Sequence, residues 1–81
     1  MADLEHIDKY KIINVIKNLD NYSVSSFSLK ILLGQLKVKL EIDTAGQAQN
    51  ECIEKVILYI KKYGNLPNVK KDIKELFGVD L

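Results

Sequence analysis

The side chains best suited to chemistry in this 81-residue chain are one histidine, His6, one cysteine, Cys52, and a cluster of serines between Tyr22 and Leu29. A metal site needs several ligands at short spacings, and His6 and Cys52 lie far apart in the sequence. The serine cluster lacks the Gly-x-Ser-x-Gly turn of a serine nucleophile, and the scattered glycines form no phosphate-binding loop. We therefore expect no catalytic residue, no metal and no cofactor, and a protein that is not an enzyme.

Charged side chains are the better candidates for binding. Twelve basic and eleven acidic residues give a net charge of +1, which provides no global field to attract nucleic acid or an acidic membrane. Charge must therefore act locally, as complementary faces that would suit a partner or a second copy of the chain. The candidate partner-binding residues are Lys61, Lys62, Lys70, Lys71 and Lys74 towards the C-terminus and Asp3, Glu5 and Asp8 near the N-terminus.

The lysines require helices to position them, and the clearest is predicted over residues 51–64. Its apolar residues recur at helical spacing and should form one buried face, comprising Ile53, Val56, Ile57, Ile60 and Tyr63. Gly64 should end this helix, and Thr44 with Gln47 has the spacing of a capping box, so the helix could begin near Ala45.

Two further helices are predicted at the ends of the chain. The first should run from Leu4 or Lys9 to Leu19, with Asp3 or Asp8 as its N-cap. The last should begin near Pro67 and end at Gly78, and its buried residues should be Val69, Ile73, Leu76 and Phe77.

The segment from Tyr22 to Asp43 fits two structures. Apolar residues alternate with polar ones from Leu36 to Ile42, which favours a strand and, with a turn at Gly34, a β-hairpin over about 27–43. Alternatively, a serine caps a helix that buries Phe27, Ile31 and Leu32 or Leu33 and ends near Gly34.

Size and composition indicate one soluble domain over residues 1–81. The chain is 47% hydrophobic and 28% charged, and it has no apolar run long enough to span a membrane. Its start carries acidic residues where a secretory signal would be basic, so we expect a cytosolic protein.

Two stretches resemble known interaction domains. The run KYKIINVIKNLDNYSVSSFSLKILLGQLKVKL, from Lys9 to Leu40, resembles the first part of pyrin domains. From Phe27 onward, the succession Leu32-Leu33, Leu36-Lys37-Val38, Asn50, Ile53, Tyr59-Ile60, Gly64, Leu66-Pro67 and Ile73 is similar to the effector-associated, death-like domains of bacterial defence proteins. Both groups are death folds, which are compact helical bundles that recruit partners through like-with-like contacts. The resemblance implies an all-α bundle of four to six short helices and favours helix over hairpin at 27–43.

The expected function is a non-enzymatic protein-protein interaction module, which recruits a partner or self-associates through charged helix faces. A small nucleic-acid-binding regulator that uses the C-terminal lysines is the alternative from another class. A small inhibitor or immunity protein is a third possibility, since such proteins are also short, helical and rich in lysine.

Overall fold

The structure is a computed structural model that describes residues 7–43 and 46–79. These residues form the helices α1 (Lys9–Lys17), η2 (Leu19–Asn21, a 3-10 helix), α2 (Phe27–Ile42), α3 (Gly46–Tyr63) and α4 (Pro67–Phe77). The described ranges contain no strand, so the prediction of a small all-α bundle is confirmed. The predicted capping box lies outside the described residues at Thr44, and so do Asp3 and Glu5.

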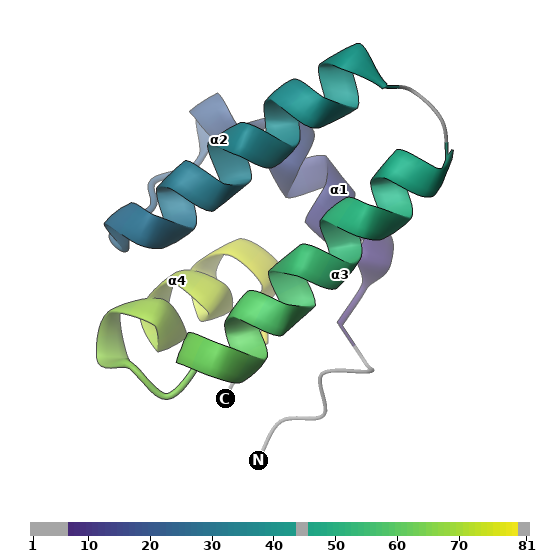
Figure 1. Ribbon diagram of the computed structural model, residues 1–81. Coiled ribbons are helices and arrows are strands. Elements are labelled where there is room, and N and C mark those ends of the chain that lie inside the picture. The colour runs from purple at the N-terminus through teal and green to yellow at the C-terminus, as the bar shows by residue number, and fades with distance from the viewer. Residues whose placement is uncertain (1–6, 44–45, 80–81) are drawn as a thin grey trace.

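The helices pack around one shared core. In Figure 1, α2 and α3 run antiparallel, α1 crosses behind them, and α4 lies beside the N-terminal part of α2 and the C-terminal part of α3. All four α-helices contribute fully buried apolar side chains to this core, among them Ile12 and Ile16 of α1, Leu29 and Leu33 of α2, Val56 and Ile60 of α3, and Ile73 and Leu76 of α4. As a result, α2 forms one edge of the molecule, with its outer side away from the other helices.

Local sequence explains most of the helix ends. Asp8 is the N-cap of α1, because its carboxylate accepts hydrogen bonds from the backbone amides of Tyr10 (2.9 Å) and Lys11 (3.4 Å). Pro67 opens α4, where a missing amide proton costs nothing. Gly78 closes α4 in the left-handed conformation (φ 69°), which a residue without Cβ adopts freely. These three predictions are confirmed.

The alternative of a β-hairpin over about 27–43 is wrong, since Phe27–Ile42 form α2. The alternation that favoured it comes from the two faces of α2. Leu36 and Leu40 point into the core, whereas Val38 and Ile42 are exposed. Positions two apart on a helix differ by about 200°, so an apolar residue at every second position can come from a helix that is apolar on both sides. Gly34 is therefore neither a turn nor a helix end but lies within α2.

The buried faces also differ from prediction in detail. The helical alternative for residues 27–33 expected Phe27 and Ile31 in the core, but both are exposed. In α3, Ile53, Val56 and Ile60 are buried as predicted, Ile57 is half-buried, and Tyr63 is 37% exposed. The α3 face is rotated towards residues that the prediction omitted, Ala48 and Cys52, which are both buried.

The N-terminus of α2 is held by a side chain from α4. Asp72 is fully buried, and its carboxylate accepts hydrogen bonds from the backbone amides of Ser25 (3.0 Å) and Ser26 (2.7 Å). Ser26 occupies the N-cap position, as predicted for one of the serines, but its hydroxyl forms no capping bond. The buried Asp72 carboxylate thus accepts from two amides and ties the segment that leads into α2, up to its N-cap residue, to α4.

Candidate functional site

The outer face of α2 carries four large apolar side chains in contact with solvent. We call this set the α2 stripe; it comprises Phe27 (77% exposed), Ile31 (45%), Val38 (53%) and Ile42 (81%). The four positions fall within an arc of about 60° on the helix, opposite the buried leucines of the same helix. A surface helix of a monomeric protein usually has one apolar face and one polar face, and α2 departs from this pattern because it has a second apolar face.

A hollow of about 720 Å³ adjoins the N-terminal end of the α2 stripe. Phe27 lines it from α2, Tyr59 and Tyr63 line it from α3, and Leu66 and Pro67 line it from the loop and start of α4. The hollow is thus mainly aromatic and apolar and continuous with the stripe through Phe27. Such a surface suits an apolar side chain of a partner.

Polar contacts fix the walls of this hollow. The hydroxyls of Ser28 and Tyr59 lie 2.6 Å apart in a hydrogen bond between α2 and α3. The rings of Tyr59 and Tyr63 are tilted by 46° with centroids 4.8 Å apart, a favourable aromatic pairing. The ammonium of Lys62 lies 5.3 Å from the centre of the Tyr63 ring. Tyr59 and Tyr63, the two aromatic residues that line the hollow from α3, are therefore both engaged in contacts with neighbouring side chains.

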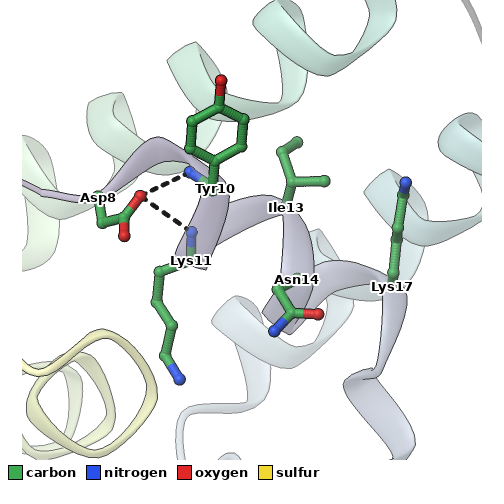
Figure 2. A pocket seen from close by; sticks show the side chains of 6 residues that line it. All are labelled: Asp8, Tyr10, Lys11, Ile13, Asn14 and Lys17. Atoms are coloured by element: carbon green, nitrogen blue, oxygen red, sulfur yellow. Dashed lines mark hydrogen bonds between the residues drawn. The ribbon is translucent and has the colours of Figure 1, made fainter.

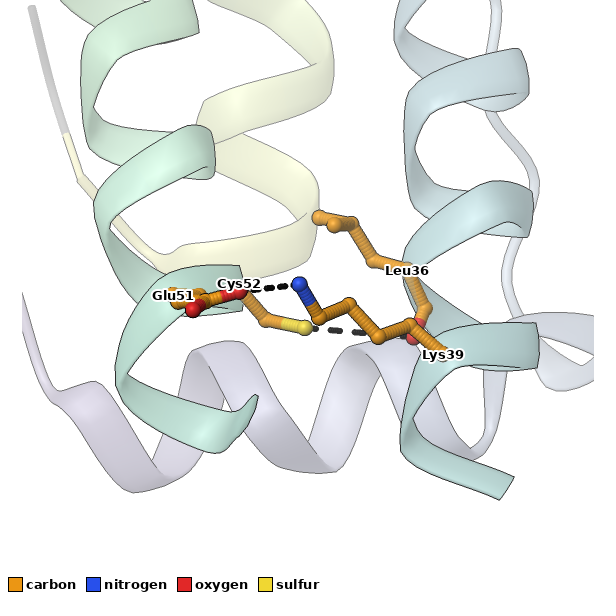
Figure 3. Close-up of polar contacts among 4 residues, drawn as sticks. All are labelled: Leu36, Lys39, Glu51 and Cys52. Atoms are coloured by element: carbon orange, nitrogen blue, oxygen red, sulfur yellow. Dashed lines mark hydrogen bonds and ion pairs between the residues drawn. The ribbon is translucent and has the colours of Figure 1, made fainter. Parts of the chain in front are cut away.

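Lys39 of α2 and Glu51 of α3 form an ion pair that fastens the two helices at the opposite end of α2 (Figure 3). The hydrogen bond from Lys39 lowers the pKa of the Glu51 carboxyl, and the same hydrogen bond raises the pKa of the Lys39 ammonium. Both groups are therefore charged at neutral pH. The pair therefore joins α2 to α3 near the end of α2 that carries Ile42.

Cys52 lies beside that ion pair but inside the core. It is fully buried, its Sγ is 3.9 Å from the carbonyl oxygen of Leu36, and burial raises the pKa of its thiol (Figure 3). A raised pKa disfavours the thiolate, which is the nucleophilic form. In this position Cys52 serves as a small packing residue of the core.

The predicted lysines are exposed but are not all brought to one place. Lys61 and Lys62 occupy the last turn of α3 at successive positions, which point about 100° apart. Lys70, Lys71 and Lys74 lie on the outer side of α4. Of the five, only Lys62 is shown beside the hollow, through its contact with Tyr63.

The predicted acidic face is represented in the described residues by Asp8 alone, since Asp3 and Glu5 lie outside them. Its carboxylate caps α1 and is therefore already engaged. Figure 2 shows Asp8 at one end of a second hollow, of about 420 Å³, along the outer face of α1. Tyr10, Asn14 and Lys17 also line it, all from the same helix, so no second element shapes this surface as α3 and α4 shape the first.

Within residues 7–43 and 46–79, no group of three or more histidine, cysteine or carboxylate side chains is arranged to hold a metal ion. None of the helices in the same ranges combines the length and the apolar character needed to cross a membrane.

The sequence prediction missed the α2 stripe because it assigned Phe27 and Ile31 to the core. The signal was present in the apolar alternation from Leu36 to Ile42, which was interpreted as a strand. The overlap of that alternation with a helical repeat at Leu29, Leu33, Leu36 and Leu40 would have indicated a helix with two apolar faces.

Comparison of the chain with protein-family models, with curated proteins and with solved structures finds no significant match.

Proposed function

We propose that this protein is a non-enzymatic protein-protein interaction module that binds through the α2 stripe and the adjoining hollow. The observation that carries the proposal is the second apolar face of α2, where Phe27 and Ile42 remain 77% and 81% exposed at the two ends of one helix. Removing such side chains from water is favourable by roughly 25 cal/mol per Å² of apolar surface. A partner that covers the stripe would gain this free energy.

The charged faces have a different role in this proposal. Charged groups around an apolar centre mainly set the rate and specificity of association, because they attract and orient the partner before contact. We assign this role to Lys62, whose ammonium lies 5.3 Å from the centre of the Tyr63 ring, and to the lysines of α4 as a wider rim. The resemblance to death-fold domains supports a binding role, and membership of that group is itself part of the proposal.

Capture of binding proteins with matched variants tests the proposal. Val38→Glu places a charge in the α2 stripe, whereas Leu58→Glu places the same charge at an exposed apolar position of α3 (63% exposed) outside it. Immobilised wild type and Leu58→Glu should retain the same bound proteins, this chain included, and Val38→Glu should lose them. Equal retention by all three proteins would refute binding through the stripe.

Nucleic-acid binding is the second candidate function, because Lys70, Lys71 and Lys74 are exposed together on the outer side of α4. Nucleic-acid binding is tested by mixing the protein with random duplex DNA at low salt. Phosphate contacts give an affinity that falls steeply as salt rises, and nonspecific dissociation constants are about 10⁻⁴–10⁻⁶ M. Absence of binding at tens of micromolar protein would exclude the alternative in practice.

A further inference from the structure

We infer that the α2 stripe binds a second copy of this chain, with the two α2 helices packed antiparallel across a two-fold axis. This inference rests on the proposed function and names its partner. Three observations support it: the symmetric order of apolar side chains along α2, the glycine at the centre of that helix, and the charged side chains Lys30 and Glu41 beside the α2 stripe.

The apolar positions of α2 are symmetric about the middle of the helix. Phe27 and Ile42 lie equally far on either side of the point just after Gly34, and so do Ile31 and Val38. In an antiparallel pair centred on that point, Phe27 meets Ile42 of the second copy and Ile31 meets Val38. A two-fold interface must be self-complementary in this way, whereas an interface with an unrelated protein has no such requirement.

Gly34 lies at the centre of this arrangement. No atom lies within 4 Å of the position that a Cβ would occupy there, so the space beside Gly34 is open. Glycine in a helix interior costs about 1 kcal/mol relative to alanine, and it allows the backbone of another helix to approach closely. The glycine therefore stands where two crossing helices would come nearest.

Charges on one side of the stripe also match their symmetry-related counterparts. Lys30 and Glu41 lie on the same flank of α2, both exposed, and neither forms an ion pair within the described part of the chain. In the antiparallel pair, Lys30 lies opposite Glu41 of the second copy, within about 3 Å along the helix axis. Lys37, on the same flank, is already paired with Asp20 at 3.0 Å. Two symmetric ion pairs would then border the apolar contact.

The size of the contact predicts a weak dimer. With 16 residues, α2 is about 24 Å long, and its four exposed apolar side chains offer roughly 400 Å² per copy. A standard protein interface buries about 800 Å² per partner, and smaller ones belong to transient complexes. We expect a monomer at low micromolar concentration and a dimer towards about 1 mM.

Sedimentation of the full chain from about 10 μM to about 1 mM tests this directly. The wild type should shift from monomer to dimer, and Leu58→Glu should behave like it. Val38→Glu should remain monomeric over the whole range, with an unchanged circular dichroism spectrum because the substituted side chain is exposed. A wild type that stays monomeric at the highest concentration would overturn the inference.

A charge exchange between copies tests the antiparallel geometry. Lys30→Glu and Glu41→Lys each set like charges opposite one another, so each variant alone should dimerise about tenfold more weakly than wild type at low salt. An equal mixture of the two restores both ion pairs and should dimerise like wild type. In NMR, ¹⁵N-labelled Lys30→Glu should therefore show shifts of its α2 amides when unlabelled Glu41→Lys is added. No shift on mixing would refute the proposed pairing.

The two proposals fail in different ways. If Val38→Glu abolishes capture of another protein while the wild type never dimerises, the α2 stripe binds a different partner and only the present inference is lost. If Val38→Glu changes neither capture nor self-association, the binding role of the stripe is lost as well.

Discussion

Substitution of the glycine at the centre of α2 should stabilise the folded monomer. Gly34 lies in a helix interior, and an added Cβ would meet no atom within 4 Å. The Gly34→Ala variant therefore incurs no clash and gains no packing, and the change in the free energy of unfolding should equal the difference in helix propensity. That difference is about 1 kcal/mol in favour of alanine.

Urea denaturation at a few micromolar protein, followed by circular dichroism, measures this quantity on the monomer. For a domain of this size the dependence of unfolding free energy on urea is about 1 kcal/mol per molar, so the midpoint should rise by about 1 M with an unchanged slope. The melting temperature should rise by about 4–8 °C. Gly46→Ala is the matched control, because Gly46 is equally open but stands at the first position of α3, where propensity counts for less.

A neutral or destabilising Gly34→Ala would refute the reasoning. It would mean that α2 is not a continuous helix through Gly34 or that a group occupies the open space there. Either result would also remove the basis for a close helix crossing at this point.

Three further outcomes are expected. Asp72→Ala should destabilise the domain by roughly 3–5 kcal/mol in denaturant titrations, since it leaves two backbone amides without their acceptor. Asp72→Asn keeps one acceptor oxygen and should cost less. Equal, small losses of stability in both variants would contradict the role of Asp72 as acceptor for these amides. The pKa of Glu51 is lowered on folding, so its ion pair with Lys39 stabilises the fold above the ordinary carboxyl pKa, and this stabilisation is lost as pH falls. The melting temperatures of wild type and Glu51→Gln should therefore converge between pH 7 and about pH 3. A difference that stays constant with pH would contradict this. Charge reversal at both Lys70 and Lys71 should leave the melting temperature within about 2 °C of wild type but slow association with a binding partner; unfolding instead would show that these lysines are structural.

Most boundaries of α1, α3 and α4 could be predicted because they depend on local patterns. The all-α class was implied by the resemblance to death folds, since the pattern from Leu36 to Ile42 alone favoured a strand. The caps at Asp8 and Gly78 and the start at Pro67 are properties of a few neighbouring residues. The apolar repeat of α4 has one period and one face, and it was assigned correctly.

The candidate site could not be predicted in the same way. Its apolar residues on α2 are of the same types as the core leucines, and only the packing of α1, α3 and α4 decides which face of α2 is covered. The hollow joins Phe27 to Tyr59 and Leu66, which lie more than thirty positions further along the chain. The bond from the Ser26 amide to Asp72 leaves no trace in residue patterns, because any residue but proline can donate a backbone amide.

That bond has a consequence for the order in which the molecule folds. It joins residues 46 positions apart, so the first turn of α2 gains its cap only after nearly the whole chain has been brought together. During synthesis the Asp72 carboxylate arrives with α4, after α2 and α3, and until then the N-terminal end of α2 is free to fray. We expect Asp72→Ala to accelerate unfolding while leaving the rate of folding almost unchanged, the signature of a contact that forms after the transition state. The end of α2 that carries Phe27 would then be the last part of the proposed binding surface to form.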